Sequence, residues 1–396
     1  MNQVSLSDVY WFQEGPGVRN WQFKESGIKL LNVANITKQG KIDLDKTDRH
    51  LSTEEVDSKY QHFLIDEGDL VIASSGITND EDNLLRTKIA FIEKQHLPLC
   101  LNTSTIRFKA KDGVSDLKFL KHWLNSLEFR QQITKEVTGI AQKNFGPSHL
   151  KKIKISLPPL TEQRRIASIL DQADELRQKR QQAIEKLDQL LQATFIDMFG
   201  DPVSNPRGWE LVSAKNVLKI QGGYAFSSTD FSKSGIPVVK IGNANKLGFS
   251  TEKFDFIIPQ YPEKLKQYEL RSGDLLMSLT GTVGKDDYGN ITEVTDDYEL
   301  YYLNQRVAKL EVINTLFSKN YIRYFFSQSS IKALITKNNR GVRQANISNS
   351  DLYELDIPLP TKAQLDKFDS FIQSINEMKR YSKIQLISSN KLFFSL

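Results

Sequence analysis

The chain of 396 residues contains one cysteine, Cys100. A disulfide bond within the chain is therefore excluded, and this cysteine usage is typical of a reducing compartment such as the cytoplasm. No apolar run approaches the roughly 18 residues that span a bilayer. The first residues also lack the basic and then apolar pattern of a secretory signal peptide. We therefore expect a cytoplasmic protein without a membrane partner.

The sequence also lacks the motifs of several enzyme classes. It has no GxxxxGK[ST] loop for a nucleotide, no HExxH pair for zinc and no GxSxG elbow for a nucleophilic serine. Its five histidines and one cysteine form no cluster with metal-ligand spacing. Pro158-Pro159 lies between Leu157 and Leu160, so it is not the Asp/Asn-Pro-Pro-aromatic run with which amino-methyltransferases hold a flipped base. The 48 acidic residues leave a lone catalytic carboxylate open, but the pattern favours a non-catalytic binding protein with no cofactor and no metal.

The composition is that of an ordinary globular protein. Hydrophobic residues make up 39% and charged residues 26% of the chain, which is enough to bury a core in each of two or three domains. The formal net charge of +5 indicates only a mild preference for an anionic partner.

An internal repeat is the most informative feature that is present. Residues 101–166 align with residues 303–368 at a constant offset of 202, and further matches toward the N-terminus have offsets of 208 and 205. A repeat of this length predicts one structural unit used twice. Matched positions carry the same residue, as in the pairs Leu101 and Leu303, Gly139 and Gly341, Asn144 and Asn346, and Pro158 and Pro360.

Each half shows the same order of predicted elements. Short apolar runs at residues 27–33 and 235–241, and again at 69–73 and 274–278, are bounded by turn residues and predict buried strands. Aromatic helical stretches follow at residues 117–129 and 321–326, and each half ends in an Ile-x-Leu-Pro motif. The fold class predicted is α+β, with two similar α/β domains.

A long helix is predicted after each proline motif. Thr161 is a candidate N-cap, and a helix from Glu162 to Met198 would be about 55 Å long. Gly200-Asp201-Pro202 would end it. A 3–4 apolar pattern predicts a coiled coil within the chain, although each helix could instead pack on its own domain. The predicted seams are Ile166, Ile169, Ala173, Leu176, Ala183, Leu187 and Leu190 in the first helix, and Phe368, Phe371, Ile375 and Met378 in the second.

A polar segment with basic residues precedes each proline motif. Lysine and arginine contact phosphates, while asparagine and glutamine pair with adenine and arginine pairs with guanine. The alternative is a capped turn in which Asn144 and Asn346 bond the local backbone. The basic residues that differ between the halves favour DNA, because packing does not explain them. The candidate DNA contacts are Lys135, Thr138, Gln142, Lys143 and Asn144, and Lys337, Arg340, Arg343, Gln344 and Asn346.

The loop after each Gly-Asp-Leu strand gives a second, weaker set of candidates. Hydroxyl groups near a strand end can lie against a DNA backbone, although any loop has a similar composition. The candidates are Ser74, Ser75 and Thr78 in the first half, and Thr280, Thr282 and Lys285 in the second.

Two sequence motifs flank the first long helix, one at its start and one at its end. The helix is entered through Ile155-Ser-Leu-Pro-Pro-Leu-Thr-Glu-Gln-Arg-Arg-Ile166 and left through Phe199-Gly-Asp-Pro202, with Gly208-Trp209 beyond. In a tandem repeat that covers the whole chain, these motifs resemble the specificity subunits of type I restriction–modification systems. The second copy departs from the pattern, since Ile357-Pro-Leu-Pro360 is followed by Thr361-Lys-Ala-Gln364 without a Glu-Gln pair.

The resemblance implies a function in DNA recognition. In that family each α/β unit is a target-recognition domain that reads one half of a split sequence in double-stranded DNA, and the two helices pack antiparallel as a spacer. Two adenine methyltransferase subunits dock on the chain and restriction–translocase subunits join for cleavage, so the chain itself carries out no catalysis. The divergence of the halves implies an asymmetric target. The implied divisions are residues 1–158, 159–200, 201–358 and 359–396.

Two further hypotheses complete the interpretation. The residues that flank the first seam, Leu170, Ile184 and Leu191, are candidates for docking the partner subunits, unless they only thicken the coiled-coil core. The rival functions are a coiled-coil scaffold without a DNA role and a stand-alone DNA methyltransferase or nuclease.

Overall fold

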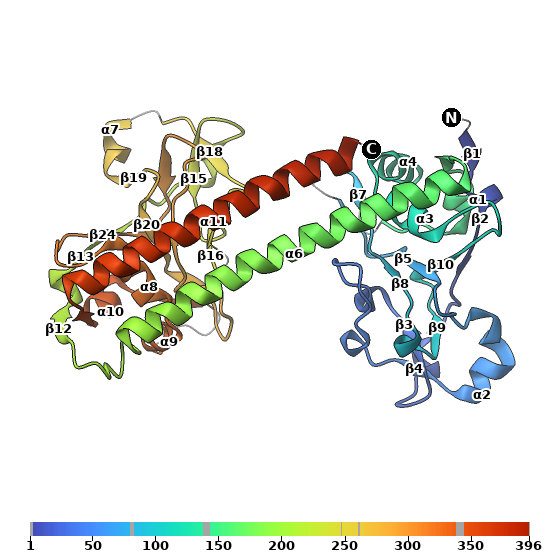
Figure 1. Ribbon diagram of the computed structural model, residues 1–396, viewed down its shortest axis with the longest axis horizontal. Coiled ribbons are helices and arrows are strands. Elements are labelled where there is room, and N and C mark those ends of the chain that lie inside the picture. Colours follow the sequence, from blue (N-terminus) through green and yellow to red (C-terminus); the bar gives the residue numbers. More distant parts are fainter. Residues whose placement is uncertain are drawn as a thin grey trace. The chain divides into compact units, whose positions relative to one another are not determined.

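A computed structural model describes residues 3–79, 83–137, 143–246, 248–259, 262–337 and 344–395. The chain forms two compact units (Figure 1). One consists of residues 1–179 with 385–396, and the other of residues 180–384. Both units combine helices with mainly antiparallel sheets, which confirms the α+β prediction.

The first unit is built on two sheets. A four-stranded antiparallel sheet has the order β2-β10-β5-β8, and a three-stranded sheet has the order β4-β3-β9 with β3 and β9 parallel. The strands are β1 (Gln3–Ser5), β2 (Tyr10–Glu14), β3 (Ile28–Leu31), β4 (His50–Leu51), β5 (Leu70–Ala73), β6 (Thr78–Asn79), β7 (Leu85–Arg86), β8 (Ile89–Phe91), β9 (Leu99–Leu101), β10 (Thr105–Ala110) and β11 (Lys154–Ser156). The helices are α1 (Leu6–Val9), α2 (Thr53–Glu55), α3 (Leu117–Trp123), α4 (Leu127–Glu136) and α5 (Pro147–Leu150).

The second unit repeats this plan. Its four-stranded sheet β13-β24-β20-β22 corresponds to β2-β10-β5-β8, and its parallel pair β15 and β23 corresponds to β3 and β9. The strands are β12 (Glu210–Ser213), β13 (Leu218–Gly222), β14 (Phe231–Ser232), β15 (Ile236–Val239), β16 (Ala244–Asn245), β17 (Gly248–Phe249), β18 (Asp255–Ile257), β19 (Glu269–Leu270), β20 (Leu275–Ser278), β21 (Thr280–Thr282), β22 (Ile291–Glu293), β23 (Tyr301–Leu303), β24 (Val307–Val312), β25 (Gln344–Asn346) and β26 (Asp356–Leu359). The helices are α7 (Pro262–Leu265), α8 (Lys319–Ser327), α9 (Ser329–Thr336) and α10 (Asn349–Tyr353).

The central strand of each sheet is apolar on both faces because each face has its own core. In β5, Leu70 and Ile72 pack into the core beneath α3 and α4, while Val71 and Ala73 belong to a second core with the β3–β9 pair. In β20, Leu275 and Leu276 divide between two cores in the same way. Side chains alternate between the faces of a strand, so the continuous apolar runs follow from double burial. This confirms the prediction of buried strands at 69–73 and 274–278.

A matched pair of glycines shows that the repeat preserves backbone contacts. A Cβ atom on Gly15 would lie 2.5 Å from the backbone of Asn102, and one on Gly223 would lie 2.2 Å from the carbonyl oxygen of Asn304. Both glycines follow the first strand of the four-stranded sheet. Only glycine permits so close an approach at these two positions.

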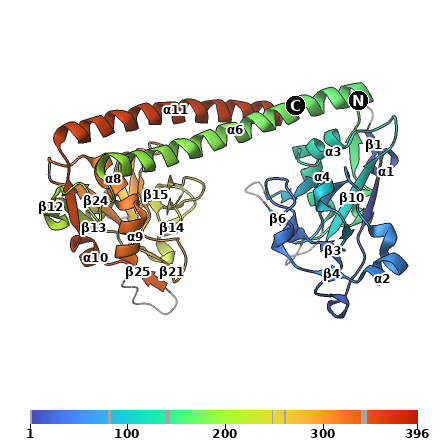
Figure 2. The ribbon, with the colours of Figure 1, turned by 60° about the horizontal axis from the view of Figure 1, so that its bottom comes forward.

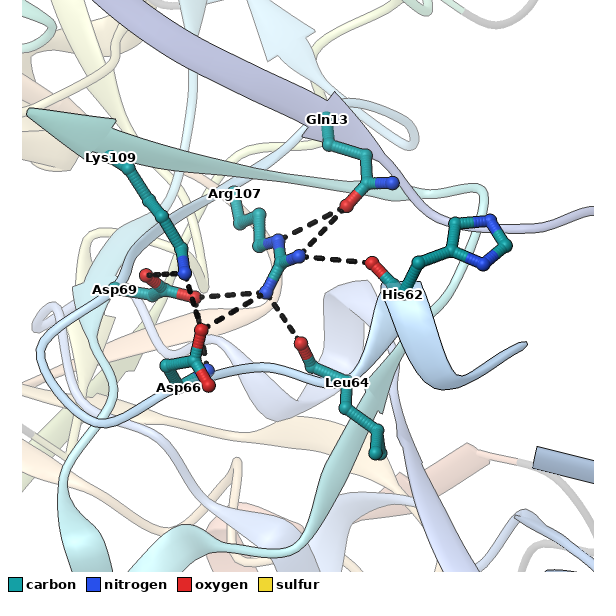
Figure 3. A network of polar contacts seen from close by, with 7 residues as sticks. All are labelled: Gln13, His62, Leu64, Asp66, Asp69, Arg107 and Lys109. Carbon is teal, nitrogen blue, oxygen red and sulfur yellow. Dashed lines mark hydrogen bonds and ion pairs between the residues drawn. The ribbon is translucent and has the colours of Figure 1, made fainter. Parts of the chain in front are cut away.

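A buried arginine joins β10 and β2 to the turn before β5 in the first unit (Figure 3). Arg107 of β10 forms an ion pair with Asp69 at 3.2 Å and donates to the side chain of Gln13 in β2 at 3.0 Å. It also donates to the carbonyl oxygens of His62 and Leu64. The guanidinium group is thereby saturated by the protein, so Arg107 serves the fold rather than a ligand.

Helix α6 (Leu160–Phe199) begins with a side chain that anchors it to the first unit. Gln163 is fully buried, and its amide group donates to the carbonyl oxygens of Pro158 and Val114 at 2.8 and 2.9 Å. Its oxygen accepts the backbone N–H of Asp116, the N-cap of α3, at 2.9 Å. These contacts explain the glutamine of the first proline-to-helix motif. In the second copy Leu365 occupies the aligned position and packs into an apolar core.

A second polar contact between α6 and the first unit predicts a pH dependence. His122 of α3 is buried and its Nε2 atom lies 2.8 Å from Asp171 of α6, with Lys118 and Lys121 also facing this carboxylate. Burial lowers the pKa of His122 below its usual value of 6.5. The unfolded chain therefore takes up a proton first as the pH falls through about 6.5, so folding stability is expected to decrease there.

This decrease can be isolated with a variant that does not titrate. His122→Gln retains a donor toward Asp171, so its urea midpoint should depend less on pH between about 7.5 and 5.5 than that of the wild type. Equal pH dependence in the two proteins would contradict a titrating His122.

In the second unit the end of α6 packs against helix α11 (Lys362–Ser395) (Figure 1). Phe195 and Phe199 meet Phe368 with ring centroids 5.8 and 5.3 Å apart. Asp188, earlier in α6, forms an ion pair with Lys379, later in α11. These contacts place the two helices antiparallel within this unit, in agreement with the predicted coiled coil. The helices also pack on α8, so the alternative of packing on the domain holds as well.

The predicted seam of α6 was partly wrong. Ile169, Leu176 and Leu190 are 43, 46 and 45% exposed. In the second unit the buried positions of α6 are instead Ile184, Leu191, Phe195 and Phe199. Their spacing follows a straight helix of 3.6 residues per turn rather than a strict heptad. Likewise, in α11 Phe368 and Ile375 are buried as predicted, whereas Met378 is exposed.

The end of α6 is fixed by the Phe199-Gly200-Asp201-Pro202 motif and the Trp209 that follows it. The helix stops at Phe199, and Gly200 has a positive φ of 80° as a C-cap glycine does. The indole N–H of Trp209 donates to the carbonyl oxygen of Phe199 at 3.0 Å. The Phe-Gly-Asp-Pro and Gly-Trp sequences therefore close the last turn of the helix together.

Candidate nucleic-acid interface

Each unit brings together the two segments that the sequence singled out separately. In the first unit the backbone N–H of Phe145 donates to the carbonyl oxygen of Ser74 at 2.9 Å, and in the second that of Ile347 donates to Leu279 at 2.8 Å. These four residues are equivalent under the repeat. The polar segment before the proline motif thus lies against the loop after the buried central strand in both halves.

In the second unit the two segments form a small antiparallel ladder, β21 with β25 (Figure 2). The register sets Thr280 opposite Asn346 and Thr282 opposite Gln344. Asp287 accepts the backbone N–H of Thr282 at 2.8 Å, and this hydrogen bond holds the pKa of its carboxyl group below the usual range. The loop after β21 is therefore closed by an ionised carboxylate. We call the exposed surface of β21, β25 and the loop 283–287 the second-unit face.

In the first unit the corresponding contact involves fewer residues. Ile77 and Lys143 form an isolated bridge, and the side-chain oxygen of Asn144 accepts the backbone N–H of Gly76 at 3.3 Å. The ammonium group of Lys143 donates to Asn79 at 3.0 Å. Asn144 therefore bonds the backbone of the facing loop, which is 68 residues away in the sequence, and not the backbone of its own turn as the capped-turn alternative requires. We call the exposed surface of residues 75–79 and 143–144 the first-unit face.

The structure places most of the candidate DNA contacts at the surface. The exposed or half-exposed candidates are Ser75, Thr78, Lys135, Lys143, Asn144, Thr280, Thr282, Lys285, Lys337 and Asn346. Ser74 is buried, and both its backbone N–H and its carbonyl oxygen are hydrogen-bonded within the unit, so it is not available to contact DNA. Thr138, Gln142, Arg340 and Arg343 lie outside the described residues, and of Gln344 only the strand is described.

Four basic residues near these faces were missed by sequence reasoning. Arg86 of β7 is exposed directly opposite Thr78 of β6. Arg306 is exposed in the turn before β24, where its carbonyl oxygen accepts the N–H of Leu279 at 3.0 Å. Lys246 and Lys332 reach the loop 283–287 of the second unit. Arg306, Lys246 and Lys332 are distant in sequence from the segments they join, and Arg86 meets Thr78 only through the register of β6 and β7. Only strand register or tertiary packing could therefore reveal these four residues.

The three candidate docking residues are covered by the chain itself. Leu170, Ile184 and Leu191 are all buried, which favours the alternative that they belong to the packed side of α6. Large apolar side chains that α6 and α11 do expose are Ile169, Leu176, Leu190 and Ile196, and Met378, Tyr381 and Ile384. These exposed residues replace the buried ones in the docking proposal. Among the described residues, no helix is both long and apolar enough to cross a bilayer.

Known proteins with sequences similar to this chain include specificity subunits of type I restriction enzymes. The family model described as the type I restriction modification DNA specificity domain matches residues 3–186 and, a second time, residues 206–386. The MjaVIII specificity subunit of a type I restriction enzyme from Methanocaldococcus jannaschii is 26% identical over 359 residues, which cover 85% of this chain and 79% of that protein. The MjaIX specificity subunit from the same organism is 24% identical and covers 78% of this chain and 73% of its own length.

Solved structures are similar over the whole chain. The S subunit of a type I restriction–modification system from M. genitalium matches with a TM-score of 0.51 at 14% identity, covering 100% of this chain and 94% of that one. A chain from a study of complex assembly and conformational transition of the type I R-M system matches with a TM-score of 0.53 at 19% identity, covering 100% and 95%. At these identities the likeness concerns the fold.

Proposed function

The chain belongs to the family of type I restriction modification DNA specificity domains, whose model it matches twice, and from this premise we propose that it reads a bipartite, asymmetric DNA target. The observation that carries the proposal is the repeated pairing of a loop after the central strand with a polar segment before the proline motif. The same backbone contact occurs in both units, yet the side chains around it differ. A shared scaffold with different surface residues suits two half-sites of different sequence.

We further propose that the chain recruits the catalytic subunits and has no catalysis of its own. Its curated relatives are named specificity subunits of type I restriction enzymes. A repeated chain presents two similar faces, so it suits a pair of methyltransferase subunits, joined by restriction–translocase subunits. The exposed apolar residues of α6 and α11 are the residues that a docked subunit would cover, and they are the candidates for this contact.

The decisive experiment is co-expression with the cognate methyltransferase, followed by sequencing of methylated adenines in the host DNA. We expect a stable complex and methylation confined to one split sequence. Exchange of the first unit for that of a relative should change only one half of that sequence. If the complex forms but the methylated sequence is not split, the bipartite reading is wrong. If neither association nor a methylated sequence is found, a coiled-coil scaffold becomes the better interpretation.

The second-unit face makes a prediction about salt dependence. Lys285 is exposed in the loop 283–287 of this face, and Lys337 is exposed at the end of α9, seven residues before β25 in the sequence. Each phosphate contact that is lost should reduce the slope of log affinity against log salt by about 0.9. The variant Lys285→Ala/Lys337→Ala should therefore bind DNA more weakly and with a slope smaller by up to about 1.8, measured by fluorescence anisotropy across a salt series.

A matched lysine elsewhere serves as the control. Lys215 is exposed in the 214–216 turn beside β12, away from β21 and β25. Lys215→Ala should leave the slope unchanged. An equal effect of both changes would mean that general charge, and not the second-unit face, attracts the DNA.

A further inference from the structure

The loop between β21 and β22 contains an acidic residue that the proposed function does not use. Asp286 forms ion pairs with two lysines, Lys246 at 2.5 Å and Lys332. Lys246 comes from the turn between β16 and β17, and Lys332 from α9. One carboxylate therefore joins three segments that are distant in sequence.

The three side chains lie at the surface to different extents. The side chain of Lys246 is 70% exposed, that of Asp286 is 52% exposed, and that of Lys332 is 21% exposed. Lys332 also donates to the side-chain oxygen of Asn290 at 2.6 Å, which fixes its ammonium group. Hydrogen bonds from Lys246 and then Lys332 hold the pKa of Asp286 below its usual range, so the carboxylate stays ionised at neutral pH.

This cluster is continuous with the second-unit face. Asp286 follows Thr282 in the same loop, and the next residue, Asp287, holds the backbone N–H of Thr282. Lys332 lies on α9, whose end leads to Lys337. DNA seated on the second-unit face would therefore bring its phosphates close to both lysines. In the observed arrangement their charge is shared with Asp286 and is not fully available to a phosphate.

We propose that Asp286 is a specificity-determining residue that restrains Lys246 and Lys332 and thereby weakens the attraction of DNA of any sequence. This inference rests on the proposed DNA-reading function and deepens it for the second unit. Phosphate attraction is independent of sequence and supplies essentially all of non-specific binding. A carboxylate that holds two lysines lowers this part of the affinity, while contacts to base edges are unaffected.

The test compares two neighbouring carboxylates in the full chain, purified with its co-expressed methyltransferase. Asp286→Asn should bind a random-sequence duplex about 3–10-fold more tightly, and its salt slope should be steeper by about 1–2 because up to two phosphate contacts are gained. The affinity for a duplex that contains the target sequence, as identified from methylation of the host DNA, should rise less. The ratio of the affinity for the target to the affinity for random DNA therefore falls. Asp287→Asn removes the same charge but keeps an acceptor for Thr282, and its salt slope should change by less than about 0.5.

A second pair of variants attributes the effect to the two lysines. In the Lys246→Met/Lys332→Met background, Asp286→Asn should no longer tighten random-duplex binding. The lysine changes alone should reduce the salt slope by less than about 0.5, whereas Lys285→Ala reduces it by about 0.9. The comparison of the double lysine variant with Lys285→Ala does not contain the Asp286 change, so it remains informative if Asp286→Asn fails to fold.

The outcomes separate this inference from the function on which it rests. If the salt slopes of Asp286→Asn and Asp287→Asn are equal, the effect comes from the loss of any negative charge in this loop and not from the release of the two lysines. That result would overturn the proposal. Weaker binding of both duplexes by Asp286→Asn would mean that Asp286 only braces the loop, and would also overturn it. A wild-type complex without any sequence preference would instead refute the proposed function itself.

Discussion

Replacement of Phe368 by alanine is expected to destabilise the second unit by about 3–5 kcal/mol. Phe368 of α11 is fully buried, and its ring meets Phe195 and Phe199 of α6 and Tyr324 of α8, with centroids 5.8, 5.3 and 5.4 Å apart. Truncation would remove the ring that contacts all three of these aromatic side chains and would leave a cavity among them. The aromatic contacts add to the loss from burial alone.

The measurement is urea unfolding of the full chain, followed by circular dichroism. Met378→Ala is the matched control, because Met378 lies on the same helix but its side chain is exposed. Its effect should stay within about 0.5 kcal/mol. Similar midpoints for Phe368→Ala and Met378→Ala would show that α11 does not pack through this aromatic cluster, and the antiparallel arrangement in the second unit would lose its main support.

The same cluster explains what the sequence could predict about the helices. Their existence and the end of α6 at Gly200 follow from local signals, such as the glycine cap and the apolar periodicity, and both are confirmed. The predicted start was wrong, because α6 begins at Leu160 and Thr161, the candidate N-cap, lies inside the helix. The face that packs depends on tertiary contacts. Phe195 and Phe199 contact Tyr321 of α8 and Phe368 of α11, so the face of α6 that carries them is the one that packs inward. A heptad count treats all apolar positions alike, so it placed Leu190 rather than Leu191 in the seam.

The candidate interface was predictable in its parts but not in its assembly. Composition identified the two polar segments, and the repeat showed that both halves contain them. Their pairing joins residues about 65 positions apart, as for Thr280 and Asn346, and depends on how the central strand leaves its sheet. Arg86 and Lys246 escaped notice for the same reason, since a basic residue acquires a role only through its neighbours in the fold.

Asp69 and Asp274, the turn residues at the start of the two central strands, have a second function that the sequence did not reveal. The side chain of Asp69 accepts the backbone N–H of Asp66 at 3.0 Å, as a turn residue does. It also neutralises Arg107, whose position aligns with Lys309 of the second unit. There Lys309 binds Asp274 at 2.7 Å. The repeat thus preserves a charge pair while changing the cation, and a sequence match scores this position as a difference.

Arg107→Met is therefore expected to cost about 3–5 kcal/mol in the first unit, because it leaves a buried carboxylate without its main partner. The side chains of Arg107 and Asp69 are only 7 and 5% exposed. Burial already raises the pKa of Asp69 above its usual range, although Lys109 and Arg107 lower it. The folded variant should thus hold a proton on Asp69 more readily than the unfolded chain. Its loss of stability should be smaller at pH about 5 than at pH about 8.

The second unit supplies the matched comparison. Lys309 and Asp274 are 25 and 22% exposed, so solvent screens their interaction, and Lys309→Met should cost about 1 kcal/mol or less. In the first unit the double change Arg107→Met/Asp69→Asn removes both charges and should recover part of the loss, measured as the coupling energy of a double-mutant cycle in urea. If the double variant is no more stable than Arg107→Met, the loss comes from the hydrogen bonds of Arg107 to Gln13, His62 and Leu64. The buried charge of Asp69 would then contribute little.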